Sequence, residues 1–501
     1  MTTPAEAGRA ALAARLDEPT LRRAPASIAA VVHDGAIVAV SAHGEPRRDG
    51  ATTTPDTIFR IASMSKSFLG ATALSLRDEG LLDLHAPATD YVPGLASARF
   101  GAERVGLTLD ALLSNRGGLT EDNAWGDEHL GESRAHMAAV VSDGLALSTR
   151  SGTDYQYSNL GISLVGRAIE AVTGRPVEDV IRERMLDPLG LRDTRAAADL
   201  YAAGADLAAG FRTFDDGASF TPEPYVGSGA LACIGSLFST VSDIAAWMQF
   251  LVSAFDDDPA DDVLRAASRR EMQTARTLMP TSPWQSTGRV LDGAGYGYGL
   301  VVEHDRRFGR IVQHAGGLPG FSSHMRWQAA TGVGVVVFGN SDSFGAGTIA
   351  GDLLADVLTR LDAPAAIVRP WPETVDAARR IDELVRTGRP LSEASALLAR
   401  NVLHDVPEPV RERRLAEALA KTGPVRTDAA PFAARILAAP DRSALRWSVP
   451  CERGALVCDV HLVGLRAPIV QEVEIQVAEA GGRKPVDETA RVTDHHRVIL
   501  D

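Results

Sequence analysis

The stretch 59–69 restricts the fold of this chain more than any other part of its sequence. A strand-like segment ends at Ile61, and the residues that follow place apolar side chains at helical spacing. Ser63 is therefore predicted at the start of a helix, with Lys66 one turn further along the same face, where its amine can reach the Ser63 hydroxyl. The pattern indicates a nucleophile with a base beside it. The helix dipole adds positive potential where an oxyanion would form.

Lysine is rare in this chain, because only three of its 51 basic residues are lysine. Arginine is effectively never deprotonated, so it cannot take the place of a lysine that accepts a proton. A lysine at position 66, in a chain that uses arginine almost everywhere else, therefore indicates a proton acceptor. On this stretch alone the alternative stays open that Lys66 is a solvated helix residue that happens to follow a serine.

The composition restricts the class of protein. A chain of 501 residues is longer than a domain with one hydrophobic core usually is, so we expect two or three domains. The hydrophobic share of 45% and the charged share of 23% are typical of a soluble globular protein. The formal net charge is −14 and no basic run is concentrated enough to follow a phosphate backbone, so no nucleic-acid partner is expected.

The compartment is predicted from what the sequence lacks. Residues 1–25 are rich in alanine and charge and hold no unbroken apolar segment, so no signal peptide is predicted. No later apolar run is long enough to span a bilayer, and we expect a cytoplasmic protein with no membrane partner. Cys233, Cys451 and Cys458 are too few for a disulfide framework and are expected as buried thiols. The sequence patterns do not indicate which oligomeric state the protein has.

Strand patterns occur at both ends of the first 360 residues. Two β-type runs flank Asp34-Gly35, a strong hairpin signal, and four late runs alternate or stay apolar between glycine breaks, as in an antiparallel meander. The terminal strands are expected to share one sheet around a helical middle that includes helices over 133–147 and 159–173. The expected strands are 27–32, 36–42, 298–302, 310–314, 322–328 and 332–338.

Two further clusters carry polar side chains suited to chemistry. Tyr157-Ser158-Asn159 lies on a loop that enters the second of these helices, although tyrosines there are usually packing residues and Asn159 could be a plain helix cap. His314 ends a late strand and is followed by Ala315, Gly316 and Gly317. The two glycines let another backbone or a substrate approach closely.

The composition changes after Asp362, where prolines mark a linker. Helices over 373–386, 391–401 and 407–421 and strands over 445–449, 455–465 and 469–477 indicate an independent α+β domain without catalytic features. We therefore predict two domains, a catalytic domain over 1–362 and a C-terminal α+β accessory domain over 363–501.

Three clusters in this order resemble the active-site motifs of the serine β-lactamase and penicillin-binding protein superfamily: Ser63-x-x-Lys66, Tyr157-Ser158-Asn159 and His314-Ala315-Gly316. The match is best to its class C-like branch of D,D-peptidases, D-aminopeptidases, esterases and transesterases. The resemblance covers about residues 25–360. It also extends to the penicillin-binding-type thioesterases that cyclise nonribosomal peptides.

The resemblance implies an α/β (α+β) fold, in which an antiparallel sheet flanked by helices lies beside an all-helical subdomain. One departure matters: the third motif of the family is most often Lys-Thr-Gly, and His314 takes the place of that lysine. A literal Lys421-Thr422-Gly423 also occurs, but it ends a predicted helix and precedes Pro424, so a helix C-terminus is its better interpretation.

The resemblance also implies a mechanism through an acyl-enzyme on Ser63. Lys66, with a pKa lowered by burial, would accept the Ser63 proton, and Tyr157 would share that role, its phenolate favoured by the nearby ammonium. Asn159 would orient Lys66 and the substrate amide, and His314 would hydrogen-bond Tyr157 or the substrate. The backbone N–H groups of Ser63 and Gly317 would form the oxyanion hole.

Two loop segments are expected to rim the substrate pocket beside Gly316 and Gly317. These are 120–131, which contains Trp125, and 293–298, although both could be ordinary loop packing. The histidines lack metal-binding spacing, so no metal and no cofactor are expected.

The resulting prediction is a serine hydrolase or acyl-transfer enzyme acting on an amide or ester of a small-molecule or peptide-like, possibly D-configured, substrate. One alternative is a nonribosomal-peptide cyclase or transesterase. Another is a catalytically silent ligand-binding protein on the same fold.

Overall fold

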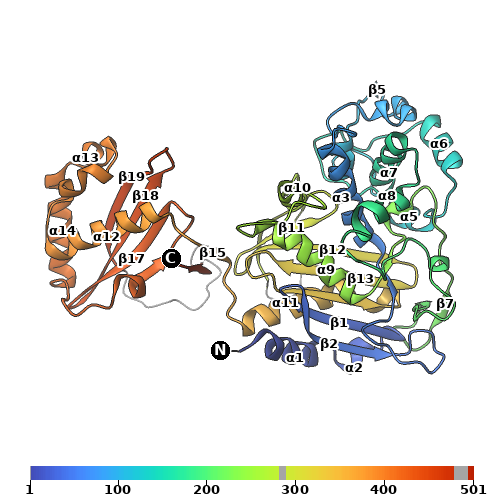
Figure 1. Cartoon of the computed structure of the whole chain (residues 1–501), viewed down its shortest axis with the longest axis horizontal. Coiled ribbons are helices and arrows are strands. Elements are labelled where there is room, and N and C mark those ends of the chain that lie inside the picture. The colour runs from blue at the N-terminus through green and yellow to red at the C-terminus, as the bar shows by residue number, and fades with distance from the viewer. Residues whose placement is uncertain (1, 281–288, 479–494, 501) are drawn as a thin grey trace. The chain divides into compact units, whose positions relative to one another are not determined.

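The computed structural model describes residues 2–280, 289–478 and 495–500, and its contacts divide the chain into two compact units (Figure 1). Unit 1 comprises residues 1–305 and 310–363, and unit 2 comprises 306–309 and 364–501. This division falls next to the predicted boundary at residue 362. The accessory role of the second part remains a prediction.

Unit 1 is built on an eight-stranded sheet in the order β2-β1-β14-β13-β12-β11-β10-β9. The first and last strands of the unit lie side by side, because β1 pairs antiparallel with β14. The prediction that the terminal strands share one antiparallel sheet is thus confirmed. In chain order, the strands are β1 Ala26–His33, β2 Ala36–Gly44, β9 Thr277–Leu278, β10 Leu291–Tyr296, β11 Val301–Asp305, β12 Gly309–Leu318, β13 Phe321–Gln328 and β14 Gly334–Gly339.

Helices cover this sheet and form a separate helical region (Figure 1). Helices α1 and α11 pack on each other and on the sheet, and α9 also contacts the sheet strands. Helix α7 has the predicted bounds, whereas α6 ends at Asp143, four residues before the predicted end, with Gly144 as its C-cap. The helices are α1 Pro4–Arg15, α2 Glu18–Leu21, α3 Ser65–Asp78, α4 Leu109–Leu113, α5 Asn123–Glu128, α6 Arg134–Asp143, α7 Asn159–Thr173, α8 Val177–Ile181, α9 Val241–Val252, α10 Ala266–Met272 and α11 Ala346–Arg360.

Helix α3 forms the centre of unit 1. All of its residues from Ser65 to Leu76 are buried, and it contacts α7, α8 and α10. Phe68 stacks on Trp247 of α9 with ring centroids 4.1 Å apart, so the helix that follows the predicted nucleophile is fixed within the core. Unit 1 also contains short strand pairs: β3 Phe59–Arg60 with β8 Phe238–Ser239, β4 Arg99–Phe100 with β5 Glu103–Arg104, and β6 Gly210–Arg212 with β7 Thr221–Glu223.

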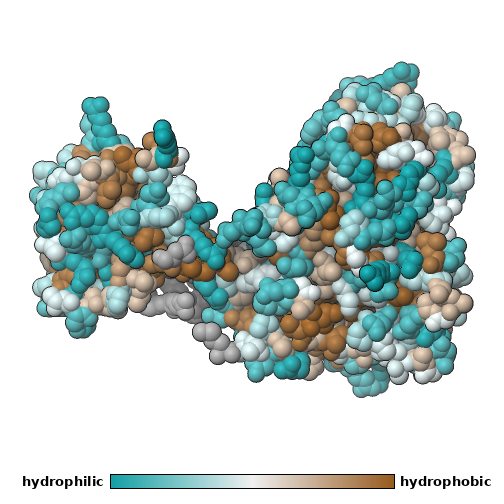
Figure 2. All heavy atoms as spheres, viewed as in Figure 1, coloured by the Kyte–Doolittle hydropathy of each residue, from teal (hydrophilic) through white to brown (hydrophobic). Residues whose placement is uncertain are grey.

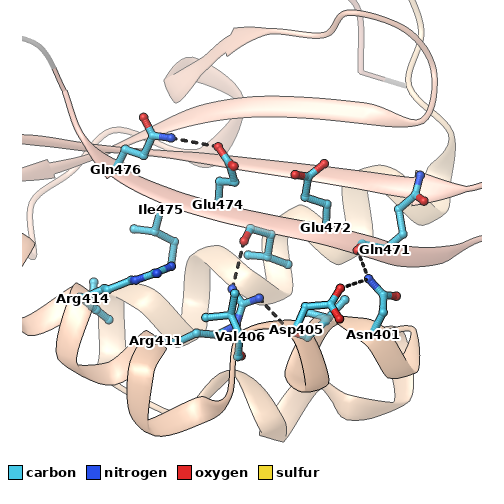
Figure 3. A pocket seen from close by; sticks show the side chains of 13 residues that line it. Asn401, Asp405, Val406, Arg411, Arg414, Gln471, Glu472, Glu474, Ile475 and Gln476 are labelled. Atoms are coloured by element: carbon cyan, nitrogen blue, oxygen red, sulfur yellow. Dashed lines mark hydrogen bonds between the residues drawn. The ribbon is translucent and has the colours of Figure 1, made fainter.

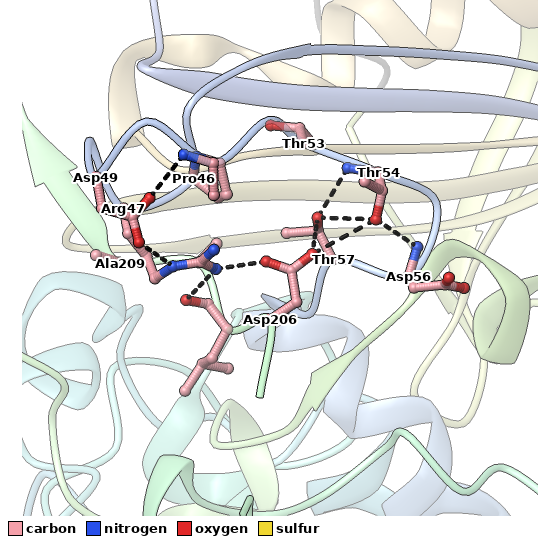
Figure 4. Close-up of polar contacts among 12 residues, drawn as sticks. Pro46, Arg47, Asp49, Thr53, Thr54, Asp56, Thr57, Asp206 and Ala209 are labelled. Atoms are coloured by element: carbon pink, nitrogen blue, oxygen red, sulfur yellow. Dashed lines mark hydrogen bonds and ion pairs between the residues drawn. The ribbon is translucent and has the colours of Figure 1, made fainter. Parts of the chain in front are cut away.

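A polar network holds the loop that leads into this region (Figure 4). Asp206 accepts hydrogen bonds from Arg47 and from the Thr57 hydroxyl, the latter at 2.6 Å. The Thr57 hydroxyl also accepts a bond of 2.9 Å from the backbone N–H of Thr54. Because Thr57 is buried directly before β3, this network fixes the direction from which the chain enters the nucleophile turn.

Unit 2 has its own core, in which helices pack against a four-stranded sheet in the order β16-β17-β18-β19. The predicted helix over 391–401 is instead a 3-10 segment, 391–397, that breaks at Ala394 and precedes the short helix α13. The elements are β15 Ala366–Val368, α12 Pro372–Thr387, α13 Arg400–Asp405, α14 Glu408–Thr422, β16 Ile436–Ala438, β17 Ala444–Cys451, β18 Gly454–Val463, β19 Ile469–Val477 and β20 His496–Val498. The strands β15 and β20 form a parallel pair.

On the face that Figure 2 shows, hydrophilic residues cover much of both units, and apolar residues gather in patches among them. Among the helices of the described residues, none has the length and apolar character needed to cross a membrane. Cys233, Cys451 and Cys458 are buried, free thiols, as expected.

Candidate active site

The turn that carries Ser63 is a short 3-10 helix, Ala62–Met64, joined directly to α3. Ala62 has φ +49°, in the left-handed region that costs energy for a residue with a side chain. Two hydroxyls hold this conformation. The Ser65 hydroxyl donates to the Ala62 carbonyl at 2.7 Å, and the Ser323 hydroxyl of β13 donates to the Ile61 carbonyl at 2.7 Å. The nucleophile therefore lies on a strained turn that its neighbours fix in place.

Gly316 of β12 allows this turn to lie against the sheet. A Cβ atom at this position would be 2.2 Å from the Ile61 carbonyl oxygen and 2.2 Å from the Ser323 hydroxyl, so no side chain fits. The close approach expected from the two glycines is thus present at Gly316. It brings the end of β12 beside Ser63.

Lys66 lies against Ser63 as the helical spacing predicts. Its amine donates to the Ser63 hydroxyl at 2.7 Å and to the Ile234 carbonyl at 2.9 Å. The side chain has no exposed area. Burial lowers the pKa of Lys66 to about 7, although Asp127 and other acidic groups nearby oppose the shift. The amine is therefore poised to lose its proton near neutral pH.

Tyr157 stands over the same amine, with the Lys66 nitrogen 5.1 Å from the centre of its ring. Burial raises the pKa of the Tyr157 phenol, and its hydrogen bond with Ser63 opposes this rise without overcoming it. The expected phenolate is thus wrong, because a buried phenol is costlier to ionise than the Lys66 ammonium is to deprotonate. Tyr157 is placed as a neutral proton donor.

His314 is buried and uncharged. Burial and the nearby Lys66 lower the pKa of His314 to about 3. Its Nδ1 lies 2.6 Å from the Ala315 carbonyl and therefore carries the proton, so Nε2 accepts from the Tyr296 hydroxyl at 3.0 Å. The ring centres of His314 and Tyr157 are 6.5 Å apart. The hydrogen-bond partner of His314 is thus Tyr296 rather than Tyr157. The sequence indicated the segment 293–298 as part of the pocket rim but did not single out Tyr296.

Asn159 begins α7 and is fully buried beside the site. Its Nδ2 donates to the Asn123 side chain at 3.2 Å, and its Oδ1 has no hydrogen-bond partner among the described residues. The two hydrogen bonds of Lys66 go elsewhere, so the structure does not join Asn159 to Lys66 as the resemblance implied. The reason is α5, which packs on Asn159 and takes up its amide.

Two acidic residues of the segment 120–131 belong to the site but were not singled out by sequence reasoning. Asp122 accepts from the backbone N–H groups of Asn159 and Leu160 at 2.6 and 2.9 Å and from the Ser158 hydroxyl at 3.1 Å, and so holds the start of α7. Asp127 interacts electrostatically with Lys66, and burial raises its pKa. A loop rich in acidic residues gave no signal for which of them would reach the nucleophile.

The remaining predicted residues lie at the rim. Trp125 of α5 is 38% exposed and stacks on His129 with ring centres 4.4 Å apart, an arrangement that fits a rim residue. Gly317 is exposed, next to the buried Gly316, and pairs in register with Ser322. The oxyanion role of the Ser63 and Gly317 N–H groups remains a prediction.

A cavity lies within unit 2, between α13, α14 and β19, with a volume of about 550 Å³ (Figure 3). Its polar lining includes Arg411, whose guanidinium donates to the Val406, Val473 and Val402 carbonyls at 2.8–3.0 Å. No serine or lysine lines it. Lys421-Thr422-Gly423 ends α14, with Lys421 exposed, as its interpretation as a helix C-terminus requires.

Comparisons with known proteins identify the family of the chain. The family model described as "Beta-lactamase" matches residues 12–359. "Unguisins hydrolase ungD'" of Aspergillus campestris is 27% identical over 325 residues, which cover 63% of this chain and 58% of that protein. "D-alanyl-D-alanine-carboxypeptidase/endopeptidase AmpH" of Escherichia coli K12 is 25% identical over 354 residues, which cover 68% of this chain and 86% of that protein.

A solved structure shows the same fold over a longer stretch. The octameric penicillin-binding protein homologue from Pyrococcus abyssi superposes with a TM-score of 0.58 at 19% identity, covering 93% of this chain and 98% of that one. The covered share exceeds unit 1 alone, so the similarity of fold extends into unit 2.

Proposed function

This chain belongs to the Beta-lactamase family, and from that premise we propose that it is a serine hydrolase that forms an acyl-enzyme on Ser63 from an amide or ester. The observation that carries the proposal is the hydrogen bond of 2.7 Å between the fully buried Lys66 amine and the Ser63 hydroxyl. A serine with a base at this distance is the arrangement that nucleophilic catalysis requires. The relative named as a D-alanyl-D-alanine-carboxypeptidase/endopeptidase supports a peptide-like substrate.

In the proposed acylation, the neutral Lys66 amine takes the Ser63 proton as Oγ attacks the carbonyl carbon. The resulting oxyanion forms near the start of α3, where the helix dipole and the backbone N–H groups of Ser63 and Gly317 would stabilise it. Tyr157, as a neutral phenol in contact with Ser63, would pass a proton to the leaving group and recover one from the Lys66 ammonium. Water or another nucleophile then releases the acyl group.

The decisive test is intact-mass measurement of the wild type and Ser63→Ala after incubation with a panel of activated esters and a penicillin. We expect a mass gain on the wild type alone. Trypsin cleaves after Arg60 and Lys66, so the adduct should map to the peptide 61–66, where fragmentation distinguishes Ser63 from Ser65. Consumption of a reagent without an adduct, absent in Ser63→Ala, would indicate fast deacylation. No adduct and no consumption would contradict the proposal.

Transfer to an amine, as in a peptide cyclase or transesterase, is the alternative outcome of the same acyl-enzyme. It differs only in the nucleophile that releases the acyl group. Adding an amine acceptor to the ester reaction and measuring how the product divides between acid and amide separates the two. A catalytically silent binding protein is disfavoured, because Ser63, Lys66 and Tyr157 are all present and in contact.

A further inference from the structure

The loop that carries Tyr157 is bound by one residue on both sides of the tyrosine. The carbonyl of Asn115 accepts a hydrogen bond of 2.9 Å from the backbone N–H of Gln156. The Oδ1 of the same residue accepts a hydrogen bond of 3.1 Å from the backbone N–H of Ser158. Asn115 therefore contacts the residue before Tyr157 and the residue after it, and fixes the segment from which the phenol extends.

Asn115 makes both bonds from an unusual backbone conformation. It lies two residues after α4 with φ +56°, in the left-handed region that asparagine adopts more readily than most residues. The residue is 2% exposed, so both bonds are shielded from water. Asp122 also binds this region, but its three hydrogen bonds go to residues 158–160, all of them after the tyrosine.

The turn that contains Asn115 is also joined to the sheet next to Tyr296. The Thr277 hydroxyl of β9 donates to the Ser114 carbonyl at 2.8 Å, and Thr277 pairs in register with Tyr296 of β10. The Asn115 side chain interacts with the Tyr296 phenol and opposes the rise in its pKa that burial causes. Its Nδ2 is buried and makes no hydrogen bond to any described residue, so this donor remains available for the phenol. One turn thus links the Tyr157 loop to the strand of Tyr296.

Tyr157 needs such support more than Lys66 does. Ser63 and Lys66 lie on one continuous helical segment, so their contact follows from the helix itself. Tyr157 lies outside a helix, yet its phenol must contact Ser63 while its ring stands over the Lys66 amine. Proton transfer requires the donor within hydrogen-bond distance of the acceptor, and a misplacement of about 1 Å can cost about 100-fold in rate.

We propose that Asn115 is a positioning residue for Tyr157 and that its side chain is required for proton transfer to the leaving group. The inference rests on the proposed function. In that step the phenol gives its proton to the leaving-group atom as the bond to the acyl carbon breaks, and the Lys66 ammonium returns a proton to the phenolate. A leaving group that departs as a stable anion needs no proton, so dependence on Asn115 should increase with the basicity of the leaving group.

The experiment compares p-nitrophenyl and methyl esters of two acids, N-acetyl-D-alanine and butyric acid. Both esters of one acid give the same acyl-enzyme, so they differ only in the acylation step. The p-nitrophenolate leaves without a proton, whereas methoxide is strongly basic and must be protonated as it leaves. The measured quantity is kcat/KM for each ester, because it reports the steps up to acylation.

Two variants at position 115 separate the side chain from the backbone. Asn115→Gly removes the side chain, while glycine keeps the left-handed conformation and the carbonyl bond to Gln156. It should lower kcat/KM about 100-fold on the methyl esters and less than about fivefold on the p-nitrophenyl esters. Asn115→Asp keeps an oxygen for the Ser158 N–H and should recover about tenfold or more of the loss on the methyl esters.

Asp216→Gly is the matched control. Asp216 lies in the turn between β6 and β7, is exposed and has the same φ of +56°, so this variant makes the same backbone change away from the Tyr157 loop. Activity on all four esters should stay within about twofold of the wild type. Thermal melting of every variant measures any loss of stability separately from the rates.

A double-mutant cycle with Tyr157→Phe tests whether Asn115 acts through the phenol. If it does, Asn115→Gly should cost less than about threefold on the methyl esters once the phenol has been removed. Full additivity of the two substitutions would instead show that Asn115 acts by another route.

Each other outcome contradicts the inference or the function on which it rests. Equal losses on both kinds of ester in Asn115→Gly would make Asn115 a residue of general packing. Activity of Asn115→Asp no better than that of Asn115→Gly would show that the acceptor for the Ser158 N–H is not what matters. If the wild type hydrolyses none of the four esters and none acylates Ser63, the proposed function itself fails.

Discussion

Both compact units bury a cation, but the two cations have opposite kinds of partner. In unit 2, Arg435 is 4% exposed and makes a bidentate ion pair with Asp382, at 2.7 and 2.5 Å. It also donates to the Ala430 and Ser448 carbonyls at 2.9 and 2.7 Å. In unit 1, Lys66 has no exposed area, and its hydrogen bonds go only to a hydroxyl and a carbonyl.

The difference between the partners of Arg435 and Lys66 shows how a buried cation can serve either stability or catalysis. A buried charge is tolerated when a carboxylate and carbonyls replace its water, and Arg435 then joins α12 to the sheet as a fixed structural ion. Where no carboxylate is in contact, the cheapest response is to lose the proton, which lysine can do and arginine cannot. The residue type and its partners therefore assign Arg435 to stability and Lys66 to catalysis.

The largest expected effect comes from removing the base. Lys66→Ala and Lys66→Arg should each lower kcat/KM on an activated ester by about 10³-fold or more, since members of a catalytic unit act together. The arginine variant is the sharper one, because it keeps the charge but cannot accept a proton. Lys421→Ala is the matched control at an exposed lysine and should leave the rate unchanged. Near-normal rates in Lys66→Ala would exclude it as the base.

Breaking the structural ion pair should act on stability instead. Asp382→Ala leaves Arg435 buried and unpaired, and also removes the acceptor of the Trp447 indole N–H at 3.0 Å. The free energy of unfolding of unit 2 should fall by about 3–5 kcal/mol. The exposed pair of Arg426 with Asp428 provides the control, since Asp428→Ala should cost less than about 1 kcal/mol. Denaturant unfolding followed by tryptophan fluorescence measures both.

Replacing Lys66, which has no carboxylate in hydrogen-bond contact, should raise the stability of unit 1 rather than lower it. The pKa of Lys66 is about 7 in the folded chain, below its ordinary value of 10.5. Between these values the unfolded chain binds the extra proton, so this group destabilises the fold by about 1.4 kcal/mol for each pH unit below 10.5.

Lys66→Met should therefore stabilise unit 1 at pH 8, by roughly 2 kcal/mol after the loss of its hydrogen bonds, while abolishing activity. The gain should shrink as the pH approaches 10. Thermal melting at the two pH values checks this, with Lys421→Met as the control. A variant that is less stable than the wild type at pH 8 would show that Lys66 is not under strain.

The smallest effect is the pH dependence of the wild type. Because the pKa of Lys66 is about 7, kcat/KM on a neutral ester should rise with pH and level off above 7, falling about tenfold per unit below it. His314, whose pKa is lowered to about 3, should not contribute to this limb. The profile should be repeated in Asp127→Asn, since that carboxylate favours the protonated Lys66. A rate that stays flat down to pH 5 would contradict a lysine base with this pKa.

Local sequence patterns predicted the parts of the fold that depend on local physics. The Asp34-Gly35 hairpin, the shared antiparallel sheet and the bounds of α7 follow from turn chemistry and hydrophobic periodicity. The contact of Lys66 with Ser63 follows from a spacing of three residues on one helix. The same reasoning correctly set aside Lys421-Thr422-Gly423, because its helix end and following proline are local features.

Predictions that needed distant partners were less successful. The neutral state of Tyr157 depends on how deeply the assembled site is buried, and no pattern around the residue reports that. The side chain of Asn159 is taken up by α5, which is distant in sequence and reaches it only because position 126 is glycine. The pairing of His314 with Tyr296 likewise joins two strands.

The sequence by itself determined that a serine and a lysine face each other at a helix start, that the first and last strands of unit 1 share one sheet, and that arginine could not replace Lys66. Only the tertiary structure decided that Lys66 is fully buried without a carboxylate in hydrogen-bond contact, that Tyr157 stays protonated, and that Asp127 interacts electrostatically with Lys66. The physical reason is that hydrogen-bond spacing along a helix is local, whereas burial and electrostatic environment are set by every element that packs around the site.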